Sequence, residues 1–314
     1  MGAGRMQRLA LSLALLAIAG WCPANAPGGG RAAAEAPPAR GFTLGERPFA
    51  AASSWNRPLP ASTPLEKLDW PADALFGVAW SSYSPAIHVG AASDPLVLVA
   101  YPASWGRAAG RLAIRIPAEA DGARGSDGEL LVIDGGTVHN FWQFRRLGPE
   151  EATAQAYAAA DLACGDGWGR ASPFLGAGIT AAGASQLAGL LVQAETDRGE
   201  IAHALQIAID AAYAKPGYTG AAIGGDGRSP AGLVQEGERL AIPAATPMPG
   251  GLSPLGGKVF RAYRRYGAFV VDVAGGVTNL RAQANAYDEA TIAALRRDLA
   301  RISPLLRRVK QTVP

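Results

Sequence analysis

The chain has 314 residues, 49% of them hydrophobic and 18% charged, with a formal net charge of +3 at pH 7. No run of lysine or arginine and no basic stripe occurs along it, which argues against a nucleic-acid-binding protein.

The N-terminus has the three parts of a secretory signal peptide. A positive n-region contains Arg5 and Arg8, and an apolar h-region follows over residues 9–21. Small residues end two candidate cleavage sites, at Ala24 and Ala26. We favour the first, because the second cut would break the bond before a rigid proline. The apolar run is shorter than the about 20 residues of a membrane span. The sequence therefore predicts a secreted or periplasmic protein with no membrane span.

Loss of this signal peptide, residues 1–26, changes two properties of the chain. It removes two arginines and no acidic residue, so the formal net charge falls from +3 to +1. It also removes Cys22, which follows the bulky Trp21 and so fits a lipoprotein cleavage site poorly. Cys164 then remains alone, and we expect a small buried thiol and no internal disulfide.

The rest of the chain reads as a tether followed by β structure. Residues 27–40 are rich in Ala, Pro and Gly and predict a flexible linker. Short β segments separated by Gly and Pro turns follow, at 96–101, 111–116, 129–134, 138–144, 201–209 and 268–273. Because strands dominate and no βαβ alternation is visible, we predict one all-β domain over residues 41–314. Its expected form is a β-sandwich or jelly roll with one or two peripheral helices.

Helical periodicity is confined to two late stretches. Residues 256–267 place four residues on one stripe, Val259, Ala262, Tyr263 and Tyr266. Residues 288–302 do the same with Ile292, Leu295, Leu299 and Ile302, and carry acids early and arginines late, as the helix dipole favours. We expect Pro304 to end this C-terminal helix and its apolar stripe to pack on the outside of the sandwich.

A hairpin is the clearest local signal. In "ELLVIDGGTVHNFW" the turn Gly135–Gly136 joins two β runs. If the register continues outward, Glu129 lies opposite Trp142 and Asp127 opposite Phe144. Carboxylates that hydrogen-bond hydroxyls and aromatic rings that stack on pyranose faces are typical of sugar sites, so this face is a candidate site.

The two faces of the hairpin are equally mixed, so the alternation does not show which is the core. One carries Leu131, Asn140 and Trp142 beside Glu129, and the other carries Leu130, Val132, His139, Phe141 and Gln143. In the alternative interpretation, Trp142 packs in the core and Glu129 sits in water. Asn140, Trp142 and Gln143 are therefore candidate substrate-binding residues only if this region lines a cleft.

Histidines supply the other candidates. His203 is a single imidazole among aliphatic residues in "IAHALQIAI", either a core histidine or a general acid or base in a cleft floor. His88 and Tyr83 belong to "WSSYSPAIHVG", an ordinary loop or an aromatic rim of the site. Because the three histidines show no metal-binding spacing, we expect no metal and no cofactor.

Three blocks together resemble a group of secreted bacterial proteins, common in actinobacteria. They are "SDGELLVID…FWQF", "GAGITAAGASQLAGLLVQAETDRGEIAHAL" and "RAYRRYGAFVVD", and the similarity spans roughly residues 53–275. The group's motifs persist at five positions, Asp127, Trp142, Gln143, His203 and Asp272, but its histidine after S-D-G is Glu129 here. The resemblance implies export and a polysaccharide-related role.

These observations lead to three hypotheses. The first is a carbohydrate-active enzyme, a glycoside hydrolase or polysaccharide lyase, with Asp127, Glu129 and His203 as catalytic residues. Hydrolysis needs two carboxyl groups roughly 5–10 Å apart, and on one strand Asp127 and Glu129 would have Cα atoms about 7 Å apart. A lyase would use His203 or a tyrosine as base.

The second hypothesis is a non-catalytic glycan-binding or envelope protein, and the third is a scaffold without a ligand. In each case we expect a monomer, with a polysaccharide or oligosaccharide as partner in the first two.

Overall fold

The computed structural model describes residues 42–168 and 177–310. The chain divides after Ala34, and the described residues all belong to the second part. The expected signal peptide and linker lie outside the described residues. Among the helices that are described, none is long and apolar enough to cross a membrane.

The described chain is mostly β, and the prediction of a sandwich-like fold is confirmed. A seven-stranded sheet has the order β1-β17-β14-β15-β11-β16-β2. A second sheet, which we call the hairpin sheet, has the order β10-β7-β6-β3, and a third, the outer sheet, has the order β5-β4-β9-β8. Strands β12 and β13 form a small parallel pair.

The strand bounds are as follows. In the seven-stranded sheet they are β1 (Leu65–Lys67), β17 (Arg307–Val309), β14 (Arg239–Ala241), β15 (Ala268–Ala274), β11 (Leu205–Asp210), β16 (Thr278–Arg281) and β2 (Phe76–Ala79). In the hairpin sheet they are β10 (Ala156–Asp161), β7 (Thr137–Trp142), β6 (Leu130–Asp134) and β3 (Ala86–Val89). In the outer sheet they are β5 (Gly110–Arg115), β4 (Leu96–Tyr101), β9 (Glu151–Thr153) and β8 (Arg145–Gly148), and the small pair is β12 (Ala214–Tyr218) and β13 (Val234–Glu236).

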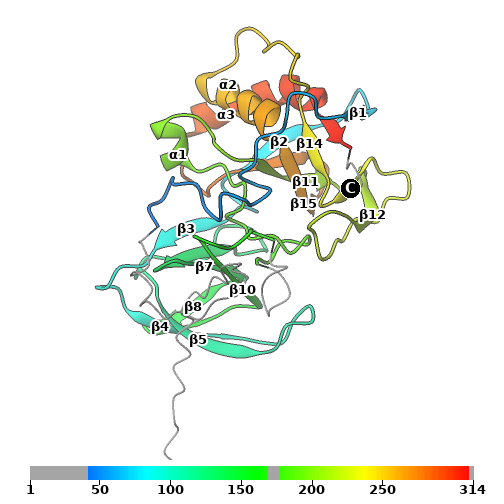
Figure 1. Ribbon diagram of the computed structural model, residues 1–314. Coiled ribbons are helices and arrows are strands. Elements are labelled where there is room, and N and C mark those ends of the chain that lie inside the picture. Colours follow the sequence, from blue (N-terminus) through cyan, green and yellow to red (C-terminus); the bar gives the residue numbers. More distant parts are fainter. Residues whose placement is uncertain (1–41, 169–176, 311–314) are drawn as a thin grey trace, which may run out of the picture. The chain divides into compact units, whose positions relative to one another are not determined.

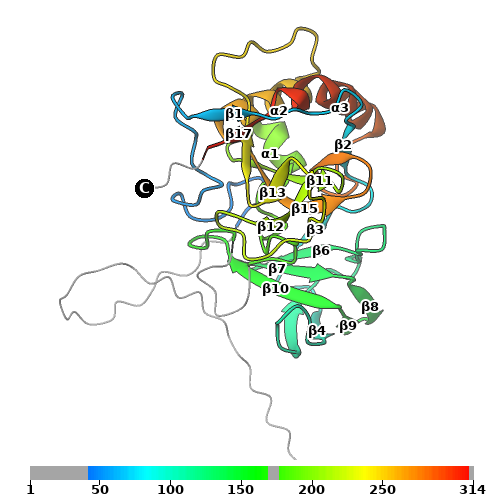
Figure 2. The ribbon, with the colours of Figure 1, turned by 90° about the vertical axis from the view of Figure 1, so that its right-hand side faces the viewer.

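Three hydrophobic clusters hold these elements together in layers. One joins the helices to one face of the seven-stranded sheet, and a second joins the other face of that sheet to the hairpin sheet. The third joins the hairpin sheet to the outer sheet. Figures 1 and 2 show the same order, with α2 and α3 at the top and β4 at the bottom.

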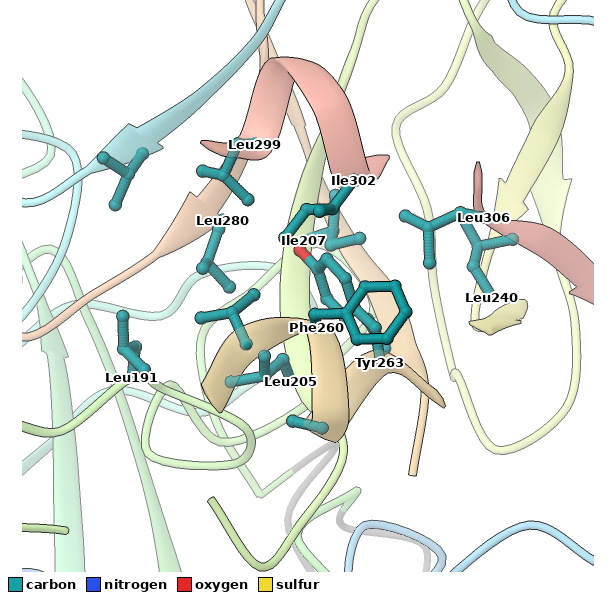
Figure 3. Close-up of a cluster of buried hydrophobic side chains, with 14 of the residues drawn as sticks. Leu191, Leu205, Ile207, Leu240, Phe260, Tyr263, Leu280, Leu299, Ile302 and Leu306 are labelled. Carbon is teal, nitrogen blue, oxygen red and sulfur yellow. The ribbon is translucent and has the colours of Figure 1, made fainter. Parts of the chain in front are cut away.

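Two helices cover the seven-stranded sheet. They are α2 (Pro254–Arg265) and α3 (Glu289–Ile302), and their N-termini are capped by Ser253 and Asp288, which accept hydrogen bonds from the backbone N–H groups of Gly256 and Thr291. Both predicted apolar stripes are buried. Figure 3 shows Leu299 and Ile302 of α3 and Phe260 and Tyr263 of α2 gathered over Ile207 of β11. The C-terminal helix is therefore confirmed, and it ends just before Pro304.

The predicted hairpin is confirmed, and its position explains its mixed composition. The pairs run from Leu130–Phe141 to Asp134–Thr137, as expected from the Gly135–Gly136 turn. Leu131 and Ile133 face the seven-stranded sheet, while Leu130 and Val132 face the outer sheet. Both faces of this hairpin are core, so no simple alternation of polar and apolar residues is present.

Two local expectations are wrong. The hairpin ladder ends at Leu130, so Glu129 does not pair with Trp142, and the N–H of Phe144 donates to the carbonyl of Gly128 instead of pairing with Asp127. Cys164 is half-buried and is not a free thiol, which corrects the expectation of an unpaired buried cysteine.

Candidate functional site

A buried arginine marks the interface between the seven-stranded sheet and the hairpin sheet. Arg281 lies at the end of β16, where Leu280 faces the helices, so its own side chain projects from the opposite face of the sheet. Its Nη2 donates to Oε1 of Glu129, and its Nη1 lies 3.6 Å from Oδ2 of Asp272. The guanidinium thus bridges an acid of each sheet.

Backbone irregularity positions Asp272. Strand β15 pairs with β11 in parallel, and the register shifts so that Ile207 matches Val270 whereas Ala208 matches Asp272. One extra residue, Val271, therefore enters β15, as in a β-bulge. The bulge places Val271 and Asp272 on the same face, so a carboxylate in a central strand is aimed toward the hairpin sheet.

Glu129 is held in a buried polar network. It is 4% exposed, and besides Arg281 its Oε1 accepts a hydrogen bond from Nε2 of Gln186. The backbone N–H of Gln186 donates to Oδ1 of Asn140 at 2.9 Å, and Nε2 of Gln206 donates to the carbonyl of Gln186 at 2.7 Å. These bonds fix the segment around Gln186 between two strands, and the charge of Glu129 is compensated by Arg281.

Three carboxyl groups form what we call the carboxyl cluster: Asp226, Glu236 and Asp272. One oxygen of each lies within 4.8 Å of the others. Glu236 ends β13 and is 1% exposed, whereas Asp226 is exposed and the side chain of Asp272 is 28% exposed. The backbone N–H groups of Asp226 and Gly227 donate to Oε2 of Glu236 at 2.8 and 3.1 Å, which ties the loop to the strand.

Burial and mutual repulsion hold protons on this cluster. Removal from water is the main cause that raises the pKa of Glu236 to about 8, and the charges of Asp226 and Asp272 add to it. Oε1 of Glu236 is buried with no hydrogen-bond partner in the described chain, which also favours the neutral form. Burial likewise raises the pKa of Asp272 to about 7, although Arg281 opposes the shift. Two carboxyl groups of the cluster, Glu236 and Asp272, therefore carry protons near neutral pH.

Three carboxylate oxygens this close together have the chemistry to hold a hard cation such as Mg²⁺ or Ca²⁺. The guanidinium of Arg281, 3.6 Å from one of the carboxylates, already supplies positive charge there and opposes a further cation. Bound protons and Arg281 would therefore compete with any cation for this cluster.

The expected catalytic residues fall in two places. Glu129 binds Arg281, whereas Asp127 acts on that guanidinium only through its charge. His203 lies just before β11 and pairs with Glu195, with 2.9 Å between Nε2 and Oε2, while its Nδ1 lies 2.9 Å from the carbonyl of Ala204. Both ring nitrogens of His203 are thus committed to buried acceptors.

The expected substrate-binding residues are dispersed. Asn140 is fully buried in the network around Gln186, and His88 is half-buried in the edge strand β3. Trp142 packs beside Ile179, with its ring centroid 5.1 Å from that of the exposed Trp105. Tyr83 is 52% exposed and Gln143 is half-buried, and they lie on either side of the loop that carries Asp127.

Sequence reasoning missed Asp226, Glu236 and Arg281. The signals were weak: an aspartate in "IGGDGR", a glutamate before a glycine in "VQEGER", and one arginine ending the short run "TNLR". These residues meet only because β15 and β16 flank β11 while β13 ends beside them.

The fold and site define a mostly β, sandwich-like protein with a carboxyl cluster and a buried arginine between two sheets. Comparison of the chain with protein-family models, curated proteins and solved structures finds no match.

Proposed function

We propose that the chain is an exported carbohydrate-active hydrolase that cleaves a glycosidic bond of an extracellular or cell-wall polysaccharide between Asp226 and Asp272. The observation that carries this proposal is a pair of carboxyl groups with oxygens within 4.8 Å, namely the exposed Asp226 and Asp272 of the central strand β15, whose side chain is 28% exposed. Glycoside hydrolases use two carboxyl groups that flank the scissile bond.

The chemistry follows from the protonation of the pair. Asp272, which holds a proton near neutral pH, donates it to the glycosidic oxygen as the C–O bond breaks. Asp226 attacks the anomeric carbon, and water then cleaves the resulting ester while Asp272 accepts its proton. The spacing is closer to the about 5–5.5 Å of retaining enzymes than to the about 6.5–9.5 Å of inverting ones. Glu236 is too buried to touch a substrate and positions Asp226 by accepting hydrogen bonds from the backbone N–H groups of Asp226 and Gly227.

A lyase has less support. A polysaccharide lyase needs a free base to remove a proton from carbon, and the candidate histidine is bonded at both ring nitrogens. A non-catalytic glycan-binding protein is the second candidate, because the aromatic side chains of Tyr83 and Trp105 are 52% and 57% exposed.

A screen of the exported protein against purified polysaccharides tests the proposal. Release of reducing ends would indicate hydrolysis, and ultraviolet absorbance of unsaturated products would indicate a lyase. On a substrate that is cut, Asp272→Asn and Asp226→Asn should each lower turnover by roughly 10²–10⁴-fold. The control is Asp197→Asn, at an exposed aspartate of α1 (Gln193–Arg198). Binding without cleavage would favour the glycan-binding alternative, and equal turnover of all variants would contradict the assigned residues.

A further inference from the structure

A polar cavity is lined in part by the loop that carries Asp127. It has a volume of about 350 Å³ and opens between the loop before β6 and the start of β8. The side chains that line it include Asp121, Ser126, Gln143, Arg145 and Arg146. Its volume falls within the about 300–1,000 Å³ of small-molecule sites.

The cavity lining carries more positive than negative charge. The guanidinium of Arg146 is held by carbonyl oxygens alone, with Nη2 2.8 Å from the carbonyl of Pro117 and Nε 3.2 Å from that of Ala120. Arg145 is exposed, and its side chain makes no hydrogen bond or ion pair with the described residues. Asp121 is the single acid of the lining, and its Oδ1 accepts a hydrogen bond from the N–H of Gly122. Two cationic groups therefore face one acid.

Strained backbone borders the same cavity. Tyr83 and Gln143 have φ values of 54° and 52°, which are unfavourable for residues with a side chain. The ring of Tyr83 lies over Gly125, and the backbone N–H of Gln143 donates to the carbonyl of Asp127 at 2.7 Å. Such strain is retained mostly where surrounding contacts hold a functional geometry.

One loop connects the cavity to the acids. Ser126 and Gly128 line the cavity, whereas the intervening Asp127 and the following Glu129 act on Arg281. A ligand in the cavity would thus lie across a single loop from the arginine that contacts Asp272.

We infer that this cavity is a subsite for a sugar unit bearing a carboxylate, so that the substrate is an anionic polysaccharide. That the bound glycan is a substrate rests on the proposed function, whereas its binding can be measured without cleavage. Arg145 and Arg146 recognise the carboxylate, the ring of Tyr83 offers an apolar face to the sugar, and Gln143 lies within reach of its hydroxyl groups.

Calorimetric titration of the whole exported protein with trimers of galacturonate and mannuronate, and with neutral galactotriose, tests the inference. At least one acidic trimer should bind at least about tenfold more tightly than the neutral one, and salt should weaken that binding. Arg145→Ala should weaken it about tenfold, since a charge-assisted contact is lost. The matched control is Arg111→Ala, an exposed arginine of β5 outside the cavity lining, which should bind as the unaltered protein does.

Equal affinity for acidic and neutral trimers, no binding of either acidic trimer, or equal effects of the two arginine variants would overturn the inference. Both variants alter exposed side chains, and unchanged melting temperatures would confirm intact folding. Acidic trimers that bind without any glycan being cleaved would refute the hydrolase and leave the subsite standing. Cleavage of neutral glycans alone would support the hydrolase and refute the subsite.

Discussion

Replacement of Arg281 by methionine should be among the most destabilising single changes in the chain. The side chains of Arg281 and Glu129 are only 3% and 5% exposed, so Arg281→Met leaves the carboxylate of Glu129 buried without its cation. Removing one partner of a buried pair costs about 3–5 kcal/mol. In a domain of this size, each kcal/mol lowers the melting temperature by about 2–4 °C.

A matched exposed pair provides the control. Arg261 binds Glu200 through two nitrogens, at 2.7 and 2.8 Å, with side chains 39% and 57% exposed. Arg261→Met should therefore cost at most about 1 kcal/mol. The double variant Glu129→Gln/Arg281→Met should be more stable than Arg281→Met alone, because no buried charge remains unpaired.

Urea unfolding of the four proteins measures these differences as shifts in midpoint at constant slope. A loss of stability in Arg281→Met no larger than that in Arg261→Met would contradict the role of the buried pair. A double variant less stable than Arg281→Met would contradict it as well.

Three further predictions concern pH and packing. Burial lowers the pKa of His203, but the hydrogen bond and the charge of Glu195 together with the hydrogen bond to Ala204 outweigh it, so the pKa is raised. The contribution of His203 to stability is therefore complete below about pH 6.5 and is lost as pH rises through the folded pKa. His203→Gln should flatten that fall in thermal melts, and an unchanged slope would argue against the charged pair. Glu236 also binds its proton more tightly in the folded state, with a pKa of about 8 against a usual 4.5. The contribution of Glu236 to folding stability is complete below about pH 4.5 and is lost as pH rises through about 8. Glu236→Gln should therefore reduce the loss of stability over that interval. Stability curves of the two proteins that run parallel against pH would contradict this. Leu299→Asp, at a side chain only 1% exposed, should cost at least about 3 kcal/mol, and an unaltered melt would mean that α3 is not docked.

The features that the sequence predicted correctly are those specified by residues close together in the chain. The two-glycine turn specified the hairpin register through five pairs, and Asp288 with its apolar stripe specified α3. The faces of the hairpin were not predictable, because β6 and β7 have core on both sides and the period-2 pattern distinguishes only a buried face from a wet one.

The candidate site was predictable only in part, because it depends on contacts distant in sequence. Asp127 and Glu129 were found from the motif before β6, but Arg281, which binds Glu129, is 152 residues farther along the chain. The presence of His203 in "IAHALQIAI" is explained by its hydrogen bond to Glu195, which lies eight residues earlier in the short helix α1. A strand that begins at Leu205 rather than Ile201 removes His203 from the expected strand face.

The pH dependence of kcat/KM on a cleaved polysaccharide tests the proposed hydrolysis most directly. Because Asp272 must be protonated to act as the acid, and its pKa is about 7, kcat/KM should fall as pH rises through about 7. Asp272→Asn should remove both the activity and this limb of the profile. A kcat/KM that stays constant to about pH 9, or an Asp272→Asn variant with unaltered turnover, would contradict the proposal.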